Sequence, residues 1–369
     1  MPRSQPQMDQ TTFEVFPVGA TPDDVLDAMA WLTLDLDHEL GADDPPRAHA
    51  DVRSYYALGW GRPWQQVNLV ARRDGQPVGF GSASVDPAHN PGNLWIHAYV
   101  APPHRRVGIG RAIVARLLQH RAADAPVTSV GFCLRASAPA ARPLVERVER
   151  DWGVAAGIVE RKSRLDLAAW SAERAASELA ERRPQAGDVR LVFFAMDDHP
   201  GPETGFDLAG YLDAINEIET LMPMEGLEQE PERFDAERLA DQVRRQRQRG
   251  RVLWSVVAID GASGDCLGYS TINFRPDDPV LVSQWGTGVV RRAQGRGLGK
   301  LLKLAMLEKL LREVPGARYV ETSNAGSNAA MIGINTDLGF REHFIERCYQ
   351  MPVGALCGRL GIEAPGDGG

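Results

Sequence analysis

The apolar and polar positions of the chain follow one pattern twice. Residues Gln65–Asp86 and Arg251–Phe274 each contain two apolar runs joined by a turn with glycine, which predicts a β-hairpin in each half. A further apolar strand follows each hairpin, over Asn93–Val100 and Leu281–Val290, and an amphipathic helix comes next. Each series then closes with a strand, a helix and a final strand. This order predicts an α/β fold in which a mixed β-sheet is flanked by helices, in two copies.

A glycine-rich turn joins the third strand to the helix in both halves. The pattern Arg/Gln-x-x-Gly-x-Gly spans Arg105–Gly110 and Gln294–Gly299, and equivalent positions lie 189 residues apart. Glycine lets the backbone approach a ligand closely. The first N–H groups of the following helix have no intrahelical partners, and the helix dipole favours an anion there. The repeated context predicts that each turn binds an anion such as a pyrophosphate.

A helical segment connects the two copies. Its pattern continues to Pro184 and stops at Gly187, as expected for a helix end followed by a linker. We therefore expect an N-terminal domain over residues 11–168, a connecting helix and linker over residues 169–187, and a C-terminal domain over residues 188–357.

Composition narrows the class of protein. A chain of 369 residues has room for two domains, and its net charge of −8 argues against nucleic-acid binding. The chain contains no run of about 18 apolar residues, so we expect no membrane-spanning helix. The N-terminus also lacks the apolar core of a secretory signal. The four cysteines form no C-x-x-C pair, so we expect neither a metal site nor a disulfide framework. These features predict a cytoplasmic protein with no nucleic-acid or membrane partner, as a monomer or homodimer.

Positive charge gathers at the two turns of this acidic chain. Residues Val289–Lys303 contain five basic residues and no acidic one, and residues His104–Arg121 contain five arginines and no carboxylate. A tight turn before a basic, solvated helix would explain one copy but not the shared context of two. The clusters therefore support anion binding at both turns.

Other nucleotide sites fit the turns less well. The P-loop pattern G-x-x-x-x-G-K-[ST] is absent, and Gly295–Gly299 reads G-x-G-x-G instead of the dinucleotide fingerprint G-x-G-x-x-G. Glu321 lies about 20 residues after the second turn, where a ribose-binding acid would stand. The first copy has no such acid, so a dinucleotide site stays the weaker alternative.

The turn between a strand and a helix resembles the acetyl-CoA signature of the GNAT superfamily, the Gcn5-related N-acetyltransferases. In the second half, Asn328 with Met331 and then Leu338–Phe340 resemble that family's later Asn-x-x-Ala and Leu-Gly-Phe motif, with methionine in place of the alanine. The two fused copies resemble the tandem arrangement of mycothiol synthase-like acetyltransferases. The resemblance implies two tandem GNAT-like domains, each a splayed mixed sheet flanked by helices.

The resemblance also implies the co-substrate and the residues that hold it. Acetyl-CoA would bind with its pyrophosphate at the turn and its pantetheine along the preceding strand, and an amine of a small molecule would attack the thioester directly in a ternary complex. The implied coenzyme-binding residues are Val289, Val290, Gln294, Gly295, Arg296, Gly297, Leu298, Gly299, Lys300 and Asn328 in the second domain, and Val100, Arg105, Arg106, Gly108, Ile109, Gly110 and Arg111 in the first.

The two copies differ in how well they keep these motifs. The second keeps both, whereas the first lacks a clear Asn-x-x-Ala and has Trp152–Val154 in place of Leu-Gly-Phe. We therefore expect the second domain to catalyse and the first to be degenerate in catalysis. His97, on the strand before the first turn, would be a base only if the first domain reacts, and otherwise it is a half-buried strand histidine.

The catalytic acid and base are less clear than the coenzyme site. Many relatives place an acidic tyrosine seven residues after the motif asparagine, but this chain has Asn335 there, and the strand before the turn lacks the usual glutamate. Tyr349 is the substitute acid unless it is a core residue, and Glu321 is the candidate base unless neighbouring basic groups hold it. Glu219 and Glu225 would line the acceptor pocket or lie in a solvated loop.

These gaps leave two alternatives to a small-molecule N-acetyltransferase. One is an enzyme that acetylates proteins or peptides. The other is a non-catalytic acyl-CoA sensor or scaffold, which the amide at Asn335 and the missing strand glutamate make credible.

Overall fold

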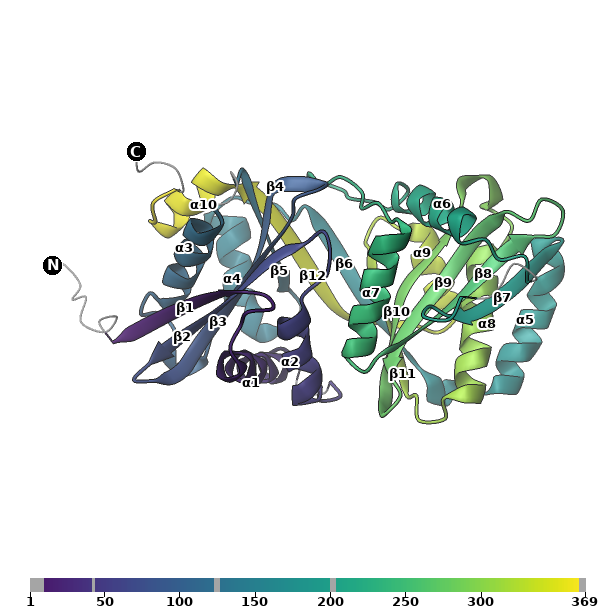
Figure 1. The fold of residues 1–369 in the computed structure, drawn as a ribbon, viewed down its shortest axis with the longest axis horizontal. Helices are drawn as coiled ribbons and strands as arrows, with labels where there is room; N and C mark the ends of the chain where they lie inside the picture. The colour runs from purple at the N-terminus through teal and green to yellow at the C-terminus, as the bar shows by residue number, and fades with distance from the viewer. Residues whose placement is uncertain (1–9, 42–43, 123–126, 200–203, 365–369) are drawn as a thin grey trace. The chain divides into compact units, whose positions relative to one another are not determined.

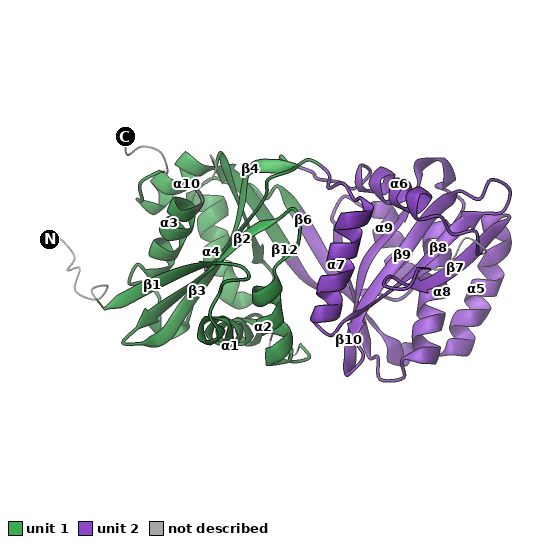
Figure 2. Cartoon of the chain, viewed as in Figure 1, with its two compact units in different colours: residues 1–158, 226–230, 346–369 green, residues 159–225, 231–345 purple. Residues whose placement is uncertain are grey.

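A computed structural model describes residues 10–41, 44–122, 127–199 and 204–364. Its contacts divide the chain into two units (Figure 2). Unit 1 comprises residues 1–158, 226–230 and 346–369, and unit 2 comprises residues 159–225 and 231–345. Each unit is an α/β structure built on a mixed sheet, as the sequence predicts (Figure 1).

Unit 1 has the strand order β1-β2-β3-β4-β5-β12. Neighbouring strands are antiparallel except β4 and β5, which are parallel. The strands are β1 (Thr11–Pro17), β2 (Gln65–Arg73), β3 (Gln76–Asp86), β4 (Asn90–Val100), β5 (Ser129–Arg135) and β12 (Arg341–Pro352), of which β12 joins unit 1 from Glu346 onward. The helices are α1 (Asp23–Leu40), α2 (His49–Leu58), α3 (Ile109–Ala122), α4 (Arg142–Glu146) and α10 (Val353–Leu360), with short helical turns η1 (Pro102–His104), η2 (Pro139–Ala141) and η3 (Arg147–Asp151).

Unit 2 has the strand order β6-β11-β10-β9-β8-β7, and its parallel pair is β10 with β11. The strands are β6 (Ile158–Asp166), β7 (Val189–Ala195), β8 (Val252–Asp260), β9 (Cys266–Arg275), β10 (Asp278–Val289) and β11 (Tyr319–Ala325). The helices are α5 (Ala172–Ala186), α6 (Leu208–Glu219), α7 (Ala236–Gln248), α8 (Leu298–Glu313) and α9 (Ala329–Asp337), with short turns η4 (Leu167–Ala169) and η6 (Arg291–Ala293). The predicted hairpins, the strands before the turns and the helices after them are all present.

The last strand of each half completes the sheet of the other half. β6 follows the elements of unit 1 in the chain, yet it pairs with β11 of unit 2 from Asp166 to Glu160. β12 follows the elements of unit 2, yet from Glu346 onward it pairs with β5 of unit 1, and Figure 1 shows this yellow strand beside β5. The sequence predicts a final strand in each half, but its partner is set by long-range pairing that the local pattern does not contain.

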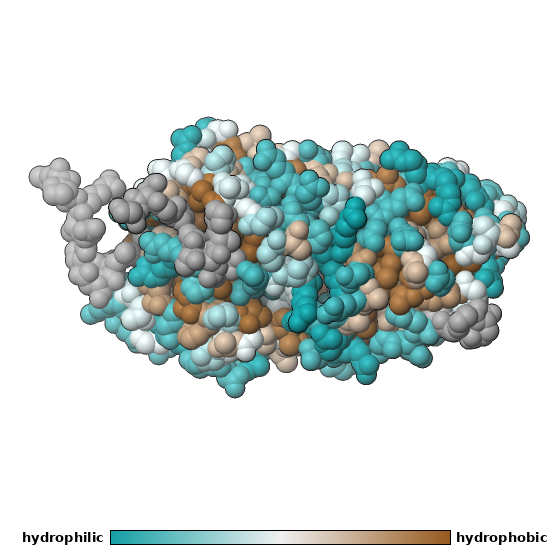
Figure 3. Space-filling view, turned by 45° about the horizontal axis from the view of Figure 1, so that its top comes forward, coloured by the Kyte–Doolittle hydropathy of each residue, from teal (hydrophilic) through white to brown (hydrophobic). Residues whose placement is uncertain are grey.

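Each unit encloses its own apolar core. In unit 1, Ile113 and Leu117 of α3 are buried on the sheet, while Met29 of α1 packs with Phe80 in a second cluster. In unit 2, one continuous cluster includes Leu304 of α8 and Tyr211 of α6. Among the described residues, no helix is long and apolar enough to cross a membrane. Figure 3 shows hydrophilic residues over much of the drawn face, with smaller hydrophobic patches between them.

Two of the cysteines differ from the expectation of unpaired thiols. Cys133 of β5 lies directly opposite Cys348 of β12 in the antiparallel pair, with their Cα atoms 4.0 Å apart, and the two form a disulfide. Their separation of 215 residues hides this proximity in the sequence. Cys266 and Cys357 are buried free thiols.

Removing this disulfide is expected to destabilise unit 1. Cys348→Ser should lower the free energy of unfolding by about 2–4 kcal/mol under oxidising conditions, because the crosslink restricts the unfolded chain. Denaturant unfolding with and without dithiothreitol would measure the effect. With reductant present the variant and the wild type should unfold nearly alike, and a difference that survives reduction would show that side-chain packing, not the crosslink, is responsible.

Candidate functional site

The sheet of unit 2 opens where its two parallel strands stop pairing. β10 pairs with β11 only from Leu281 to Ser283, which oppose Tyr319 to Glu321. β10 continues to Val289 and β11 to Ala325 without further pairing partners between them. The two strands therefore diverge in front of the glycine turn, as the family resemblance implies for a strand that pairs with pantetheine.

A β-bulge re-aims β10 at the start of this opening. Gln284 opposes Ile272 on β9 and Gly286 opposes Thr271, so Trp285 between them has no partner on β9. The Gln284 side chain donates hydrogen bonds to the Ser270 hydroxyl and the Thr271 carbonyl, which fixes the strand at the bulge. Trp285 is 42% exposed. Bulges commonly turn side chains toward functional sites, and the sequence analysis did not single out Trp285.

The first residue of the motif makes the same contact in both units. Gln294 Nε2 donates to the carbonyl of Val289 at 3.2 Å, and Arg105 Nε donates to the carbonyl of Val100 at 2.8 Å. Each side chain therefore ties the start of the turn back to the end of the preceding strand. This shared contact explains why a donor of similar reach stands at this position in both copies.

The glycines of the turn have backbone conformations that suit an anion site. Gly297 and Gly108 have φ values of 74° and 97°, in the left-handed region that favours glycine. Gly295 has φ 78°, and a Cβ atom there would meet nothing within 4 Å. Gly297 precedes α8 without any side-chain hydrogen bond to cap the helix. The first N–H groups of α8 are thus available to a phosphate, and the residues present fit a pyrophosphate.

Neighbouring groups already engage part of the basic cluster. Arg296 donates to the carbonyl of Ala186 at 2.6 Å, and Lys300 forms a 3.2 Å ion pair with Asp337. Arg292 pairs with Asp265 at 3.1 Å. The anion affinity expected of the turn therefore depends mainly on backbone amides and the helix dipole.

Lys303, which the sequence places in the basic cluster, belongs to the core instead. It is 4% exposed and faces a small cavity lined by Ile272, Leu307 and Phe340. Its amine lies 5.3 Å from the centre of the Phe340 ring. Burial lowers the pKa of this amine to about 7.

Two asparagines of the second motif stand beside the opening. Asn328 caps α9, because its Oδ1 accepts a hydrogen bond from the Met331 amide at 3.2 Å. Asn335, at the position of the family's tyrosine, is 3% exposed and donates to Asn324 Oδ1 on β11 at 2.7 Å. In the described part of the chain, Asn335 Oδ1 has no hydrogen-bond partner.

The two predicted catalytic residues lie in different units. Glu321 of β11 lies in unit 2, where Arg164 donates to its carboxylate at 2.7 Å. Tyr349 lies in unit 1, fully buried and stacked on Phe132. Its hydroxyl donates to Glu149 at 2.9 Å, and burial raises the pKa of the phenol. Tyr349 is therefore a core residue of unit 1 and does not join the turn at Gln294–Gly299, because β12 pairs with β5.

The two carboxylates considered for an acceptor pocket differ in their surroundings. Glu225 accepts a hydrogen bond from the Ser327 amide at 3.1 Å, which lowers the pKa of its carboxyl. Glu219 ends α6, and burial raises its pKa to about 7. Glu219 is therefore the better candidate for a group that exchanges protons near neutral pH.

In unit 1 the sheet also opens between its two parallel strands, but the side chains around the glycine turn make different contacts. β4 pairs with β5 only from Asn93 to Trp95. Arg105 of its turn is held by Glu39 of α1 through two hydrogen bonds, of 2.7 and 2.5 Å. His97 of β4 lies edge-on to Phe80, with ring centres 5.2 Å apart.

Comparisons with known proteins agree with this geometry. Residues 32–148 match the Acetyltransferase (GNAT) family. Mycothiol acetyltransferase of Nocardia farcinica (strain IFM 10152) is 29% identical over 303 residues, 81% of this chain and 88% of the relative.

Two solved structures share the fold. A tandem GNAT protein from the clavulanic acid biosynthesis pathway superposes with a TM-score of 0.69 and 24% identity, covering 92% of this chain and 98% of that one. A GCN5-related N-acetyltransferase from Sphaerobacter thermophilus has a TM-score of 0.60 and 17% identity, covering 92% and 95%. The GNAT family match covers the first turn, Arg105–Gly110, and ends before the second.

Proposed function

Because the chain is an N-acetyltransferase that carries a GNAT domain, we propose that it transfers the acetyl group of acetyl-CoA to a primary amine of a small molecule. GNAT acetyltransferases in general use acetyl-CoA. The amine nitrogen bonds to the acetyl carbon, the carbon–sulfur bond breaks, and coenzyme A leaves as the thiol. The N. farcinica relative is named for mycothiol and not for a protein, which supports a small-molecule acceptor.

The observation that carries this proposal is the arrangement of β10, β11 and α8 in unit 2. The strands diverge after Ser283, and the turn at Gln294–Gly299 presents the N-terminus of α8 at the far end of β10. A thioester held along β10 would have its phosphates at the helix and its acetyl group in the opening. Positioning of two substrates in this way supplies much of the rate enhancement in direct transfer.

We assign the reaction to unit 2. Unit 2 keeps both motifs, and its Gln294 has no carboxylate partner among the described residues, whereas Glu39 occupies Arg105 in unit 1. The family match to residues 32–148 argues that unit 1 retains the coenzyme fold. The cytoplasm supplies acetyl-CoA, and we propose that the enzyme works there.

Titration of the full chain with acetyl-CoA tests this assignment. We expect calorimetry to detect saturable binding in unit 2, which Gly297→Val strongly weakens and Gly108→Val leaves in place. Turnover is then followed by thiol release with a panel of small amines. Binding without turnover for every amine would favour an acyl-CoA sensor, and no binding at either turn would reject the proposal.

A further inference from the structure

We propose that Glu219 is the general base of unit 2 and takes a proton from the acceptor ammonium. This assignment rests on the proposed function and adds a residue that neither signature motif contains. Glu219 is the last residue of α6, on the face of the sheet opposite α8. The carboxylate has neither a hydrogen-bond nor an ion-pair partner among the described side chains, which leaves its oxygens available to a substrate.

The position of α6 brings this carboxylate to the bulged part of β10. Ile218, the neighbour of Glu219, occupies the space beside Gly288, where an added Cβ would lie 2.2 Å from the isoleucine Cγ2. The Tyr269 hydroxyl lies 3.0 Å from the place of a Cβ on Gly286. The glycines of β10 therefore make room for the end of α6 and for Tyr269, next to the opening between β10 and β11.

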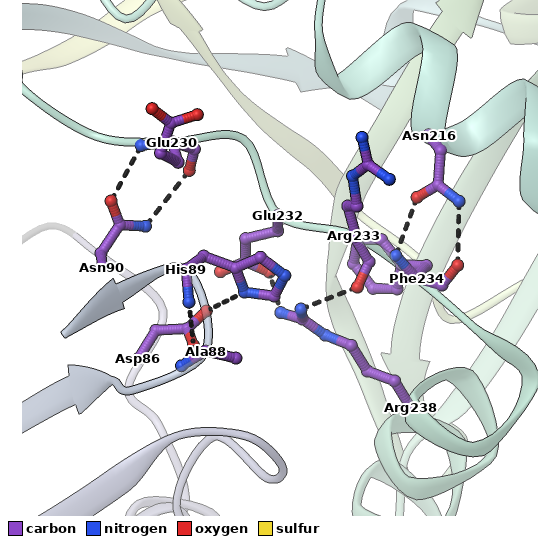
Figure 4. A network of polar contacts seen from close by, with 10 residues as sticks. All are labelled: Asp86, Ala88, His89, Asn90, Asn216, Glu230, Glu232, Arg233, Phe234 and Arg238. Atoms are coloured by element: carbon purple, nitrogen blue, oxygen red, sulfur yellow. Dashed lines mark hydrogen bonds and ion pairs between the residues drawn. The ribbon is translucent and has the colours of Figure 1, made fainter.

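A set of polar contacts fixes the surroundings of Glu219. Asn216, three residues earlier and on the same side of α6, exchanges two hydrogen bonds with the backbone of Phe234, at 2.9 and 2.8 Å (Figure 4). This clamp holds the segment that carries Glu232 close to the end of α6. Glu232 forms an ion pair with Arg238 (Figure 4). The Arg238 guanidinium therefore binds the Glu232 carboxylate and not that of Glu219.

The charged and titratable groups around Glu219 set its protonation near neutral pH. Burial is the main cause of its raised pKa, Glu232 raises it further, and Arg238 of α7 opposes them, which gives a value of about 7. The C-terminal end of α6 also disfavours a negative charge. On β9, Tyr269 stays protonated because burial and Glu219 raise its pKa well above the usual range. A base with this pKa accepts a proton efficiently at physiological pH.

The proton balance of the reaction is then complete. An acceptor ammonium gives one proton to the Glu219 carboxylate and becomes a nucleophilic amine. After the amine attacks and the carbon–sulfur bond breaks, the nitrogen loses its second proton to the departing thiolate, directly or through water. Glu219 returns its proton to solvent, and the products are the amide and coenzyme A.

The test compares Glu219→Gln with the wild type, using acetyl-CoA with glucosamine, ethanolamine and putrescine as acceptors. We expect kcat at pH 8 to fall roughly 100-fold, as for loss of a general base, while acetyl-CoA affinity is unchanged. Wild-type kcat should rise with pH through about 7 and then become constant. In Glu219→Gln this rise of kcat with pH, the pH limb, should be absent. Glu219→Asp should keep the limb at a lower rate. Asp213→Asn, on the exposed side of α6, is the matched control and should behave as the wild type.

Stability supplies a second readout that does not depend on turnover. Because a buried carboxylate is costly when ionised, Glu219→Gln should have a higher Tm than the wild type at pH 8. The difference should shrink as pH falls through about 7 and vanish below about pH 4, where the carboxyl is protonated in both the folded and the unfolded chain. Wild-type turnover by Glu219→Gln, or loss of the pH limb in Glu321→Gln in its place, would overturn the assignment. Absence of turnover by the wild type with all three amines would reject the proposed function, and this assignment with it.

Discussion

Replacing Gly297 with valine should weaken acetyl-CoA binding to unit 2 roughly 1,000-fold. Gly297 has φ 74°, which a β-branched residue adopts only with strain, so the turn would rearrange and its amides would no longer converge at the start of α8. Loss of two charge-assisted hydrogen bonds at about 1.5–3 kcal/mol each corresponds to a loss of this size. The basic residues cannot compensate, because Arg296 and Lys300 are engaged by Ala186 and Asp337.

The repeat supplies a matched control for this substitution. Unit 1 has Arg106 at the position of Gly295, with φ 68°, so a side chain is compatible with the left-handed backbone at that position. Gly295→Asn should therefore bind acetyl-CoA within about threefold of the wild type, since asparagine tolerates this conformation. Gly297→Asn should retain more affinity than Gly297→Val for the same reason. Equal affinities of Gly297→Val and the wild type in calorimetry would show that the turn does not hold the phosphates.

Replacing Lys303 with methionine should stabilise the protein by up to about 5 kcal/mol at pH 7 and below. Burial lowers the pKa of this amine from 10.5 to about 7, and 3.5 pKa units correspond to a cost of this order. Methionine has a similar length and fills the apolar surroundings near Leu307 and Phe340 without a charge. The cation–π contact with Phe340, at 5.3 Å, offsets only part of the cost.

The pH dependence of the stability difference distinguishes removal of the buried Lys303 charge from a change in side-chain packing. Between pH 7 and 10.5 the unfolded chain binds the Lys303 proton and the folded chain does not, so the wild type gains stability from this group as pH rises. The advantage of Lys303→Met should therefore shrink from pH 7 to pH 10.5. Urea unfolding at pH 6.5 and pH 10 would measure it. Lys309→Met, which removes an ion pair with Glu313 on the same helix, should show no such gain. A gain that does not change with pH would identify packing as the source.

The parts of the fold that the sequence predicts are those set by local patterns. The hairpins, the turn and α8 follow from strand alternation, glycine spacing and helical periodicity, and the repeat at Arg105–Gly110 and Gln294–Gly299 marked both turns independently. The partner of a final strand is not local information. Tyr349 was assigned to the second domain by its place in the chain, but β12 pairs with β5, which puts the phenol in the core of unit 1.

In the candidate site too, some residues could be predicted from local sequence patterns and others only from their three-dimensional contacts. Its glycines and motif asparagines were recognisable because their spacing carries the chemistry. Lys303 appeared as one member of a basic cluster, since a helical pattern does not reveal which lysine faces the sheet. Glu219 and Glu225 are equal candidates by sequence. Burial of Glu219, with Glu232 as a smaller cause, raises the pKa of its carboxyl, whereas the hydrogen bond from Ser327 lowers the pKa of Glu225.

The exchange of β6 and β12 has a consequence for inheritance. A gene reduced to either half would encode a sheet whose β5 or β11 ended in an open hydrogen-bonding edge, and such edges recruit other chains. Loss of one half would therefore leave the survivor incomplete. The strand exchange therefore gives each half a structural need for the other, whichever of them binds the coenzyme.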